Sequence, residues 1–414
     1  MKILIIKPSS LGDVVHGLYV LKPLKDAFPQ SEIHWLVDVA YKDLVSGNSL
    51  TDKTWIIDRS RWKNSKNILS DFWKLGRQLN AENFDAVIDL QGLFRSGILT
   101  YLTRAPLRIG FSDARELAPL FYNRKVKGGK NIHAVERYVR LINLIPKRGT
   151  IFGPVPQNNI IVQAGGCRRG PPNLRQQAYW PMPKLGVKAD RTRTVTITEE
   201  KISILRSTSP RLRRTQDDRG NAQNNSDSKY YVVVAGGRWE SKRWPAEYFS
   251  DVIKQIPMKC VLVGGKEDKE IGDEIFCRID MASNRNDIGK TTLQELVSII
   301  HDAQFILTND SGPMHIAAAL GTPVFALFGP TDPQGTGPYG KGHKVFQADL
   351  DCVPCLKKKC PLTGENYMKC MKKIHPETIL MEIFKKFMIN DKRNIDPSVA
   401  GAPRDDRREI TRQF

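Results

Sequence analysis

The chain has 414 residues, which is too long for one typical core and suggests two α/β domains with additional segments. Its formal net charge is +20 and its mean hydropathy is −0.38. No apolar run approaches the ~20 residues of a membrane span, and residues 1–7 lack the features of a signal peptide, so we expect a cytoplasmic chain without a transmembrane segment. The positive charge favours an anionic partner: nucleic acid, an acidic membrane surface or a phosphorylated substrate. No helix-turn-helix, zinc-finger or aromatic RNA-binding motif is present, so we expect no nucleic-acid partner.

The first element predicted is a strand over residues 2–7, followed by a Gly-containing loop and a helix from about Val14. A strand, such a loop and a helix are the opening unit of a doubly wound parallel sheet. Asp13 would lie at the helix N-terminus, where the helix dipole keeps a carboxylate ionised. It is either a simple helix cap or a catalytic group, since such folds place functional residues at this edge of the sheet.

The next predicted strands alternate with helical stretches, which indicates a parallel sheet covered by helices on both faces. A helix with apolar residues at helical spacing closes the first domain. The strands are expected at 32–37, 54–57, 85–90 and 107–111, and the helices at 68–79, 93–102 and 133–144.

Basic residues recur after the ends of these strands. A solvated surface is their usual explanation, but they would also line one edge of the sheet with positive charge, suited to an acidic acceptor. The residues in question are Arg59, Arg61, Lys63, Arg95 and Arg115.

The periodicity disappears over residues 148–228, where 14 Lys and Arg face 6 Asp and Glu. A structureless loop of this length is unusual inside a compact protein. We interpret it as a mostly disordered insertion or linker, or as a stretch translated from a shifted frame. The two domains would then be 1–147 and 229–388, and the charged tail 389–414 is expected to be disordered.

In the second domain, three predicted strand ends carry turns that suit phosphate groups. The strand 230–235 leads into a turn with Lys242 before a helix, and the strand 261–265 ends near Asp268, which is either a ribose ligand or an acidic first helical turn. After the apolar run 305–307, Ser311 can cap a helix and Gly312 permits close approach of an anion, with His315 one turn in. This repetition predicts a cleft for a nucleotide diphosphate.

Four of the seven cysteines cluster in a Lys-rich loop with the spacing C-x2-C-x4-C-x9-C. Four thiolates could hold zinc, but this spacing is not that of a standard zinc ribbon. We therefore expect reduced thiols packed in a loop, with structural metal as the alternative. The cluster consists of Cys352, Cys355, Cys360 and Cys370.

Taken together, several of these motifs resemble glycosyltransferase family 9, the ADP-heptose:lipopolysaccharide heptosyltransferases, over about 1–147 and 229–385. Segments 114–116, 120–125 and 133–137 look most like heptosyltransferase I, whereas 309–315 has the more general form of the family. The resemblance implies a GT-B architecture, in which two Rossmann-like domains face each other across a cleft. The matching motifs are residues 7–13, 89–93, 238–245, 309–315 and 328–333.

The resemblance further implies an inverting transfer of L-glycero-D-manno-heptose from ADP-heptose to Kdo of lipid A, at the cytoplasmic face of the inner membrane. Asp13 would be the catalytic base and Lys242 would neutralise the departing diphosphate. No metal would be obligatory, although Mg²⁺ could stimulate. Alternatives are heptosyltransferase II or another family 9 transferase, or an inactive sugar-nucleotide-binding protein.

The implied donor-binding residues are Ser10, Gly12, Arg238, Ser241, Asp268, Asp310, Ser311, Gly312 and His315, and the implied acceptor-binding residues are Arg59, Arg61, Lys63, Arg95 and Arg115.

Overall fold

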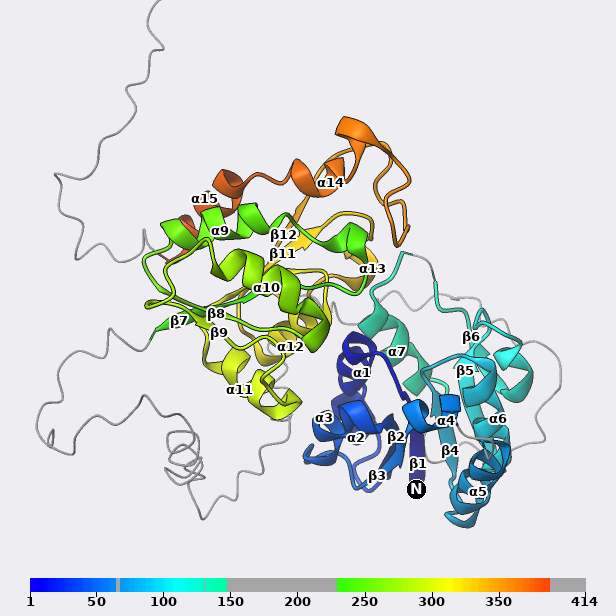
Figure 1. The fold of residues 1–414 in the computed structure, drawn as a ribbon. Helices are drawn as coiled ribbons and strands as arrows, with labels where there is room; N and C mark the ends of the chain where they lie inside the picture. The colour runs from blue at the N-terminus through cyan, green and yellow to red at the C-terminus, as the bar shows by residue number, and fades with distance from the viewer. Residues whose placement is uncertain (65–67, 130, 147–228, 388–414) are drawn as a thin grey trace, which may run out of the picture.

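The computed structural model describes residues 1–64, 68–129, 131–146 and 229–387. The segment 148–228 and the tail 389–414, for which disorder is predicted, lie outside the described residues. The described residues form two α/β domains, coloured blue to cyan and green to orange in Figure 1.

The first domain alternates strands and helices through most of its length. Its strands are β1 (Lys2–Ile6), β2 (Glu32–Asp38), β3 (Lys53–Ile57), β4 (Ala86–Asp89), β5 (Leu107–Phe111) and β6 (Arg124–Val126). Its helices are α1 (Leu11–Leu18), α2 (Leu21–Ala27), η1 (Val39–Tyr41), α3 (Lys42–Ser46), α4 (Arg59–Asn64), α5 (Ile68–Ala81), α6 (Phe94–Leu102), η2 (Ala118–Phe121) and α7 (Ala134–Ile142).

The second domain repeats this alternation. Its strands are β7 (Tyr230–Val234), β8 (Lys259–Leu262), β9 (Arg285–Asn286), β10 (Ile306–Asn309), β11 (Val324–Phe328) and β12 (Lys344–Gln347). Its helices are η4 (Glu240–Lys242), α9 (Ala246–Gln255), η5 (Lys266–Asp268), α10 (Lys269–Phe276), α11 (Leu293–Asp302), α12 (Gly312–Leu320), α13 (Pro333–Thr336), η6 (Gly364–Asn366), α14 (Lys369–Lys372) and α15 (Pro376–Phe387).

Each domain contains a six-stranded sheet, with the orders β3-β2-β1-β4-β5-β6 and β12-β11-β10-β7-β8-β9. All strand pairs are parallel, and the second order is the first one read from the opposite edge. The strand order reverses between β1 and β4 and between β7 and β10. In such folds ligands bind beyond the carboxyl ends of the strands at this reversal, so the loops after these four strands are the expected site.

The central strands are buried on both faces, which explains their continuous apolar sequences. Residues 3–6 of β1 and 324–328 of β11 have at most 1% of their surface exposed. One cluster of buried side chains includes Val14 and Val15 of α1 together with Met314 and Ala317 of α12. The two domains therefore share apolar packing where α1 and α12 lie side by side (Figure 1).

The α/β class and the alternation of elements are confirmed, with two kinds of correction. The first helix begins at Leu11 rather than near Val14. Three edge strands were missed, β6, β9 and β12, because they have only 2–4 residues and include charged ones, so they carry little apolar signal.

Candidate active site

Asp13 lies in the first turn of α1, directly after the carboxyl end of β1. Ser10 is the N-cap residue, and its backbone N–H and its hydroxyl donate to Asp13 Oδ2 at 3.1 and 2.9 Å. This reciprocal cap moves the start of the helix upstream of the predicted position. Asp13 Oδ1 takes part in neither bond, so the carboxylate caps the helix and keeps a second oxygen at the edge of the sheet.

The buried side chain of Lys7 balances the charge of Asp13. Lys7 is only 3% exposed, and its Nζ lies 5.3 Å from the ring centroid of Tyr138. Burial alone would lower the pKa of Lys7, but Tyr138, Asp13 and Asp89 hold it above its ordinary value. For Asp13, burial alone would raise the pKa. The charge of Lys7 and the hydrogen bonds from Ser10 outweigh this effect, so the pKa of Asp13 is lowered. Asp13 is therefore ionised at neutral pH.

In the second domain, Lys242 is held by Asp310. Lys242 Nζ donates to Asp310 Oδ2 at 2.6 Å, and Thr331 Oγ1 donates to the same oxygen at 2.6 Å. The ammonium also lies 4.6 Å from the ring centroid of Trp239. Lys242 ends η4, Asp310 follows β10 and Thr331 follows β11, so three loops at the carboxyl edge of the sheet meet at one carboxylate.

The turn before α12 is fixed by the side chain of Asn309, at the end of β10, which bonds to the backbone beyond β7. Asn309 Nδ2 donates to Ala235 O at 2.7 Å, and its Oδ1 accepts from Trp244 N at 3.2 Å. Ser311 is the N-cap of α12, as predicted, but its hydroxyl pairs with Thr308 Oγ1 at 2.9 Å instead of capping the helix. That side chain therefore leaves the first N–H groups of α12 for another acceptor.

Three histidines meet where the two domains touch. The ring centroids of His16 and His315 are 4.2 Å apart, and those of His16 and His133 are 5.1 Å apart. His133 Nδ1 accepts from Val135 N, so its Nε2 carries the hydrogen and donates to Gly337 O of the second domain at 3.0 Å. His16 Nε2 and His315 Nδ1 are buried without a hydrogen-bond partner among the described residues. Such orphaned buried atoms mark positions where a ligand can bind.

The two candidate catalytic residues, Asp13 and Lys242, have opposite effects on the pKa of His315. Burial is the largest cause that lowers the pKa of His315, to about 4, while Asp310 and Asp13 act in the opposite direction and Lys242 adds to the lowering. The imidazole is therefore neutral at neutral pH. Asp13, Asp310 and Lys242 thus all influence His315, and the catalytic roles of these residues stay predictions.

Two glycines let the amino ends of α1 and α12 meet. A Cβ added at Gly12 would lie 2.4 Å from His315 Cδ2, and one added at Gly312 would lie 2.5 Å from Leu11 Cδ2. The positive ends of two helix dipoles are thereby brought together, which favours an anion at this junction. Because α1 and α12 are in direct contact, the interdomain cleft itself stays a prediction.

Two of the predicted donor residues lie just before Lys242 in the chain. Arg238 is exposed, whereas Ser241 is 3% exposed and its hydroxyl donates to Lys357 O at 2.6 Å. The hydroxyl of Ser241 thus ties η4 to the Cys-rich loop. The donor-binding roles of both residues stay predictions.

Asp268 packs against the end of β7. A Cβ at Gly236 would lie 2.1 Å from Asp268 Cγ, so only glycine fits beside this carboxylate. Asp268 Oδ2 accepts from Gly265 N at 3.0 Å, and Oδ1 is buried without a partner among the described residues. Burial is the main cause that raises the pKa of Asp268. Its position is compatible with the predicted ribose contact, which stays a prediction.

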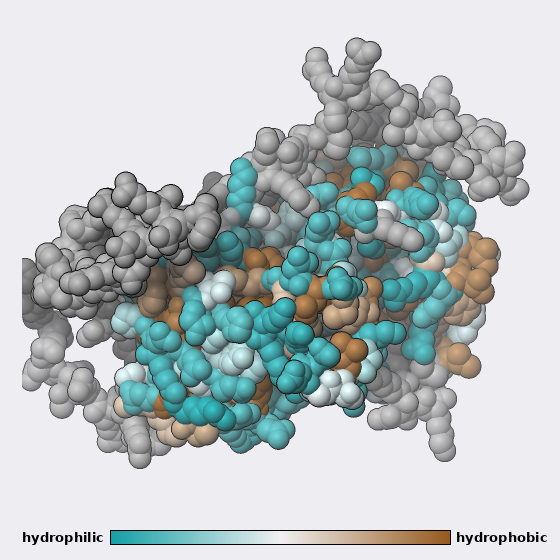
Figure 2. All heavy atoms as spheres, turned by 90° about the horizontal axis from the view of Figure 1, so that it is seen from above, coloured by the Kyte–Doolittle hydropathy of each residue, from teal (hydrophilic) through white to brown (hydrophobic). Residues whose placement is uncertain are grey.

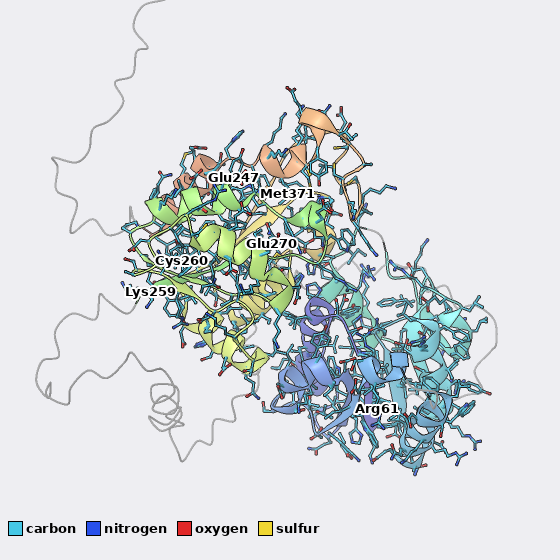
Figure 3. The ribbon with its side chains drawn as sticks, viewed as in Figure 1. Arg61, Glu247, Lys259, Cys260, Glu270 and Met371 are labelled. Atoms are coloured by element: carbon cyan, nitrogen blue, oxygen red, sulfur yellow. The ribbon has the colours of Figure 1, made fainter. Side chains whose placement is uncertain are left out.

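The predicted acceptor residues have different environments. Arg59 donates to Asp38 Oδ2 and to Ser9 Oγ, both at 2.6 Å, and so braces the loop that carries Asp13. Arg61, Arg95 and Arg115 are exposed, and Arg61, labelled in Figure 3, is a residue of α4. The side chain of Lys63 lies outside the described residues. The acceptor roles of these residues stay predictions.

Sequence reasoning gave no role to Asp89, which shapes the loop after β4. Its Oδ1 accepts from Gln91 N and Gly92 N at 2.8 and 3.0 Å, and its Oδ2 accepts from Tyr122 Oη at 2.6 Å. A charged residue that ends an apolar run was the available signal, and the same signal marks Lys7. The histidine junction had no such signal, because it depends on how the domains pack.

The four clustered cysteines are free thiols in the structure. Cys360 Sγ accepts from Met368 N at 3.4 Å, and Met371, labelled in Figure 3, packs beneath the loop against Gly329. Among the residues that the structure describes, no group of three or more His, Cys, Asp and Glu side chains is arranged to hold a metal ion. Within the same residues, no helix combines the length and apolar character required to cross a bilayer.

Known proteins resemble the chain in sequence. The family model described as glycosyltransferase family 9 (heptosyltransferase) matches residues 72–153 and 190–365. Lipopolysaccharide heptosyltransferase 1 of Escherichia coli K12 is 27% identical over 375 residues, covering 87% of this chain and 98% of the relative. Lipopolysaccharide heptosyltransferase 2 of Salmonella typhimurium is 25% identical over 390 residues, covering 92% and 97%. Relatives of both kinds are therefore similar to this chain.

Solved structures resemble the fold over most of the chain. The structure of E. coli ADP-heptose LPS heptosyltransferase II has a TM-score of 0.66 at 24% identity, covering 93% of this chain and 98% of that one. An E. coli heptosyltransferase with ADP has a TM-score of 0.62 at 24% identity, covering 93% and 99%. These likenesses confirm the predicted GT-B fold. Because the family model matches more than half of a chain with this fold, the protein belongs to glycosyltransferase family 9, the heptosyltransferases, and is a glycosyltransferase.

Proposed function

We propose that the chain is an inverting transferase that moves L-glycero-D-manno-heptose from ADP-heptose to a Kdo hydroxyl of lipid A. The observation that carries this proposal is the meeting of Asp13, ionised in the first turn of α1, with His315 and the Lys242–Asp310 pair of the second domain. A base on one side and a cation with hydrogen-bond donors on the other are what a single displacement at a sugar carbon requires.

In the proposed step, Asp13 accepts the proton of the acceptor hydroxyl while the hydroxyl oxygen attacks the anomeric carbon of the heptose. The bond between that carbon and the diphosphate oxygen breaks, and ADP leaves with the electron pair. Attack from the face opposite the leaving group inverts the configuration, so no residue forms a covalent bond to the sugar. Asp13 has the right character as base because it is ionised and half-buried.

The leaving diphosphate needs positive charge and hydrogen-bond donors. Lys242 supplies the charge, and the N-terminus of α12 with Gly312 supplies backbone N–H groups that the Ser311 hydroxyl leaves open. Neutral His315 can donate one hydrogen bond to the same group. Because these residues can compensate the charge, we expect no obligatory metal and at most a stimulation by Mg²⁺.

The names of relatives and neighbours support the donor. One solved structure with 24% identity is an E. coli heptosyltransferase with ADP-2-deoxy-2-fluoro heptose. The first three curated relatives are lipopolysaccharide heptosyltransferases 1, which favours transfer to Kdo and a location at the cytoplasmic face of the inner membrane. Transfer to an acceptor that already carries a heptose, as in type 2 relatives, is the second candidate.

Mass spectrometry of the reaction product tests the proposal. Purified protein is incubated with ADP-heptose and either Kdo₂-lipid A or the same acceptor carrying one heptose. We expect the mass of one heptose to be added to Kdo₂-lipid A only. Addition to the heptosylated acceptor alone would support the second candidate, and ADP-heptose binding without transfer to either acceptor would indicate an inactive sugar-nucleotide-binding protein.

A further inference from the structure

The first domain carries large apolar side chains on its surface, around α6 and η2. Leu117 and Leu120 are 67% and 75% exposed, and Tyr101 and Phe94 are 58% and 41% exposed. The ring centroids of Phe94 and Tyr101 lie 5.6 and 6.2 Å from that of Phe121. We call this surface the α6–η2 patch, defined by Phe94, Tyr101, Leu117 and Leu120.

Glycine packing makes the patch one continuous surface. A Cβ at Gly97 would lie 2.5 Å from Phe121 Cδ2, so η2 can rest closely on α6. The neighbouring helix α5 packs on α6 through Gly76 and Leu102 in the same way. Trp73 of α5 is a further exposed apolar residue, at 51%. Figure 2 shows brown surface at its right-hand edge, on the side where α6 and β6 lie in Figure 1.

The electrostatic surroundings of the patch are positive. Residues 91–127 contain seven Lys and Arg against two Asp and Glu. Both acidic residues accept hydrogen bonds from backbone N–H groups, Glu116 from Phe94 at the start of α6 and Asp113 from Gly128. The arginines, in contrast, include exposed ones at positions 95, 104 and 115.

Exposed aromatic and leucine side chains with arginines around them are the composition of a surface that enters the headgroup region of a bilayer. A protein partner would match the apolar part, but anionic lipid matches both the apolar part and the positive rim. Phe94, at the start of α6, follows the carboxyl end of β4, the edge of the sheet that also carries Asp13. From there the patch extends along α6 toward the start of β5, where Arg108 contacts Phe121 O and the ring of Tyr101.

We propose that the α6–η2 patch docks the protein on an anionic lipid bilayer. The apolar side chains insert among the headgroups while the surrounding arginines contact lipid phosphates. This inference rests on the proposed function in one respect: an acceptor anchored in that bilayer would then lie beside the domain that carries Asp13.

Vesicle flotation of the full chain tests the docking directly. We expect binding to phosphatidylethanolamine–phosphatidylglycerol vesicles that weakens at high salt, and weaker binding to phosphatidylcholine vesicles. The double variant L117S/L120S should bind the anionic vesicles about tenfold or more weakly, because two leucines no longer insert. The matched control M381S, which replaces a side chain 62% exposed on α15, should stay within about twofold of wild type.

Arg104→Gln separates the charge from the apolar contribution. Arg104 is exposed beside the patch, so this variant should lose part of its binding to anionic vesicles and none of its binding to phosphatidylcholine. Equal flotation of L117S/L120S and wild type would overturn the proposal. So would a wild-type dimer in sedimentation without lipid that L117S/L120S abolishes, because the patch would then belong to a second copy.

Transfer assays keep this proposal apart from the proposed function. L117S/L120S should transfer heptose to a deacylated, water-soluble Kdo acceptor at the wild-type rate and to vesicle-bound Kdo₂-lipid A more slowly. If wild type transfers to neither acceptor, the proposed function fails while the flotation result still decides the docking. Circular dichroism and thermal unfolding confirm that the exposed substitutions leave the fold intact.

Discussion

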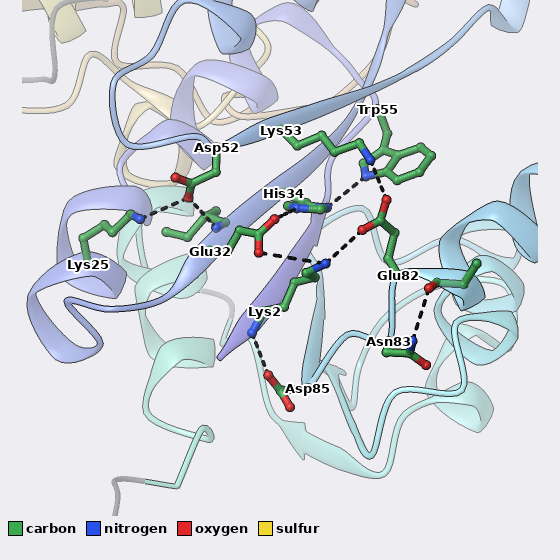
Figure 4. A network of polar contacts seen from close by, with 12 residues as sticks. Lys2, Lys25, Glu32, His34, Asp52, Lys53, Trp55, Glu82, Asn83 and Asp85 are labelled. Atoms are coloured by element: carbon green, nitrogen blue, oxygen red, sulfur yellow. Dashed lines mark hydrogen bonds and ion pairs between the residues drawn. The ribbon is translucent and has the colours of Figure 1, made fainter.

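The two edges of the first sheet use polar groups in opposite ways. At the amino-terminal edge, shown in Figure 4, Lys2 Nζ lies 3.0 Å from Glu82 Oε2, and buried His34 has a partner for each ring nitrogen. At the carboxyl edge, where α12 of the second domain packs on α1, His315 is also buried, yet its Nδ1 has no partner among the described residues. Paired groups stabilise the fold, whereas a buried group left unpaired is available to a ligand.

Among substitutions at the two edges, Asp13→Asn should reduce transfer activity most. Asn can still accept hydrogen bonds from Ser10, but it cannot take a proton, so we expect kcat to fall about 10²–10⁴-fold. Because buried Lys7 loses its counter-charge, we also expect some loss of stability in a protein that still folds. The matched control is Asp85→Asn at the amino edge, where Asp85 Oδ2 accepts from Lys2 N at 2.6 Å. Steady-state transfer kinetics check this, and near-wild-type turnover of a folded D13N would exclude Asp13 as the base.

Lys242→Ala should cause the second largest loss of transfer activity. Loss of the ammonium removes charge compensation from the leaving diphosphate, and we expect a cost of about 2–4 kcal/mol in transition-state stabilisation. Lys53→Ala is the control, because Lys53 pairs with Glu82 at the amino edge and should leave kcat unchanged. Partial recovery in Lys242→Arg would support a role through charge, whereas an unchanged rate in K242A would exclude the assignment.

The two edges should lose stability in different pH ranges, and His315 sets the range at the carboxyl edge. The pKa of His315 is 6.5 in the reference state and about 4 in the fold, so the unfolded chain binds a proton that the folded chain does not. The free energy of unfolding should therefore fall as the pH drops from 6.5 to 4, by up to about 3 kcal/mol from this residue. Urea titrations at several pH values measure it, and His315→Gln should flatten this region. Equal slopes in both proteins would contradict the assignment.

Glu82→Gln should have the smallest effect on stability and no effect on transfer activity. Hydrogen bonds from Lys53 and then Lys2 are the main causes that lower the pKa of Glu82 from 4.5 to about 2. Its contribution is fully present above pH 4.5 and is lost as the pH falls through 2, below the range of His315. Because the side chain is 19% exposed, we expect a loss of at most about 1 kcal/mol at neutral pH and unchanged transfer activity. A tenfold loss of activity would break the proposed separation of the two edges.

Much of the site was predictable because its residues lie in short local motifs. The loop before α1, the turn after β7 and the turn before α12 each contain glycine, proline and polar residues after an apolar run. These patterns were enough to select Asp13, Lys242 and His315 as candidates, and their roles stay predictions. The exact contacts of Ser241 and Ser311 were not predictable. Their hydroxyls face Lys357 and Thr308, and only the folded loops decide which acceptor is nearest.

By itself, the sequence determined the α/β class and the order of most elements, because periodicity and turn residues act over a few positions along the chain. Its motifs, taken together, also carried the resemblance to the family. The tertiary structure alone decided that His16, His133 and His315 meet, that buried Lys7 lowers the pKa of Asp13, and that Leu117 and Leu120 remain exposed. These features depend on packing between segments far apart in the sequence, where the energy of burial rather than local propensity selects the arrangement.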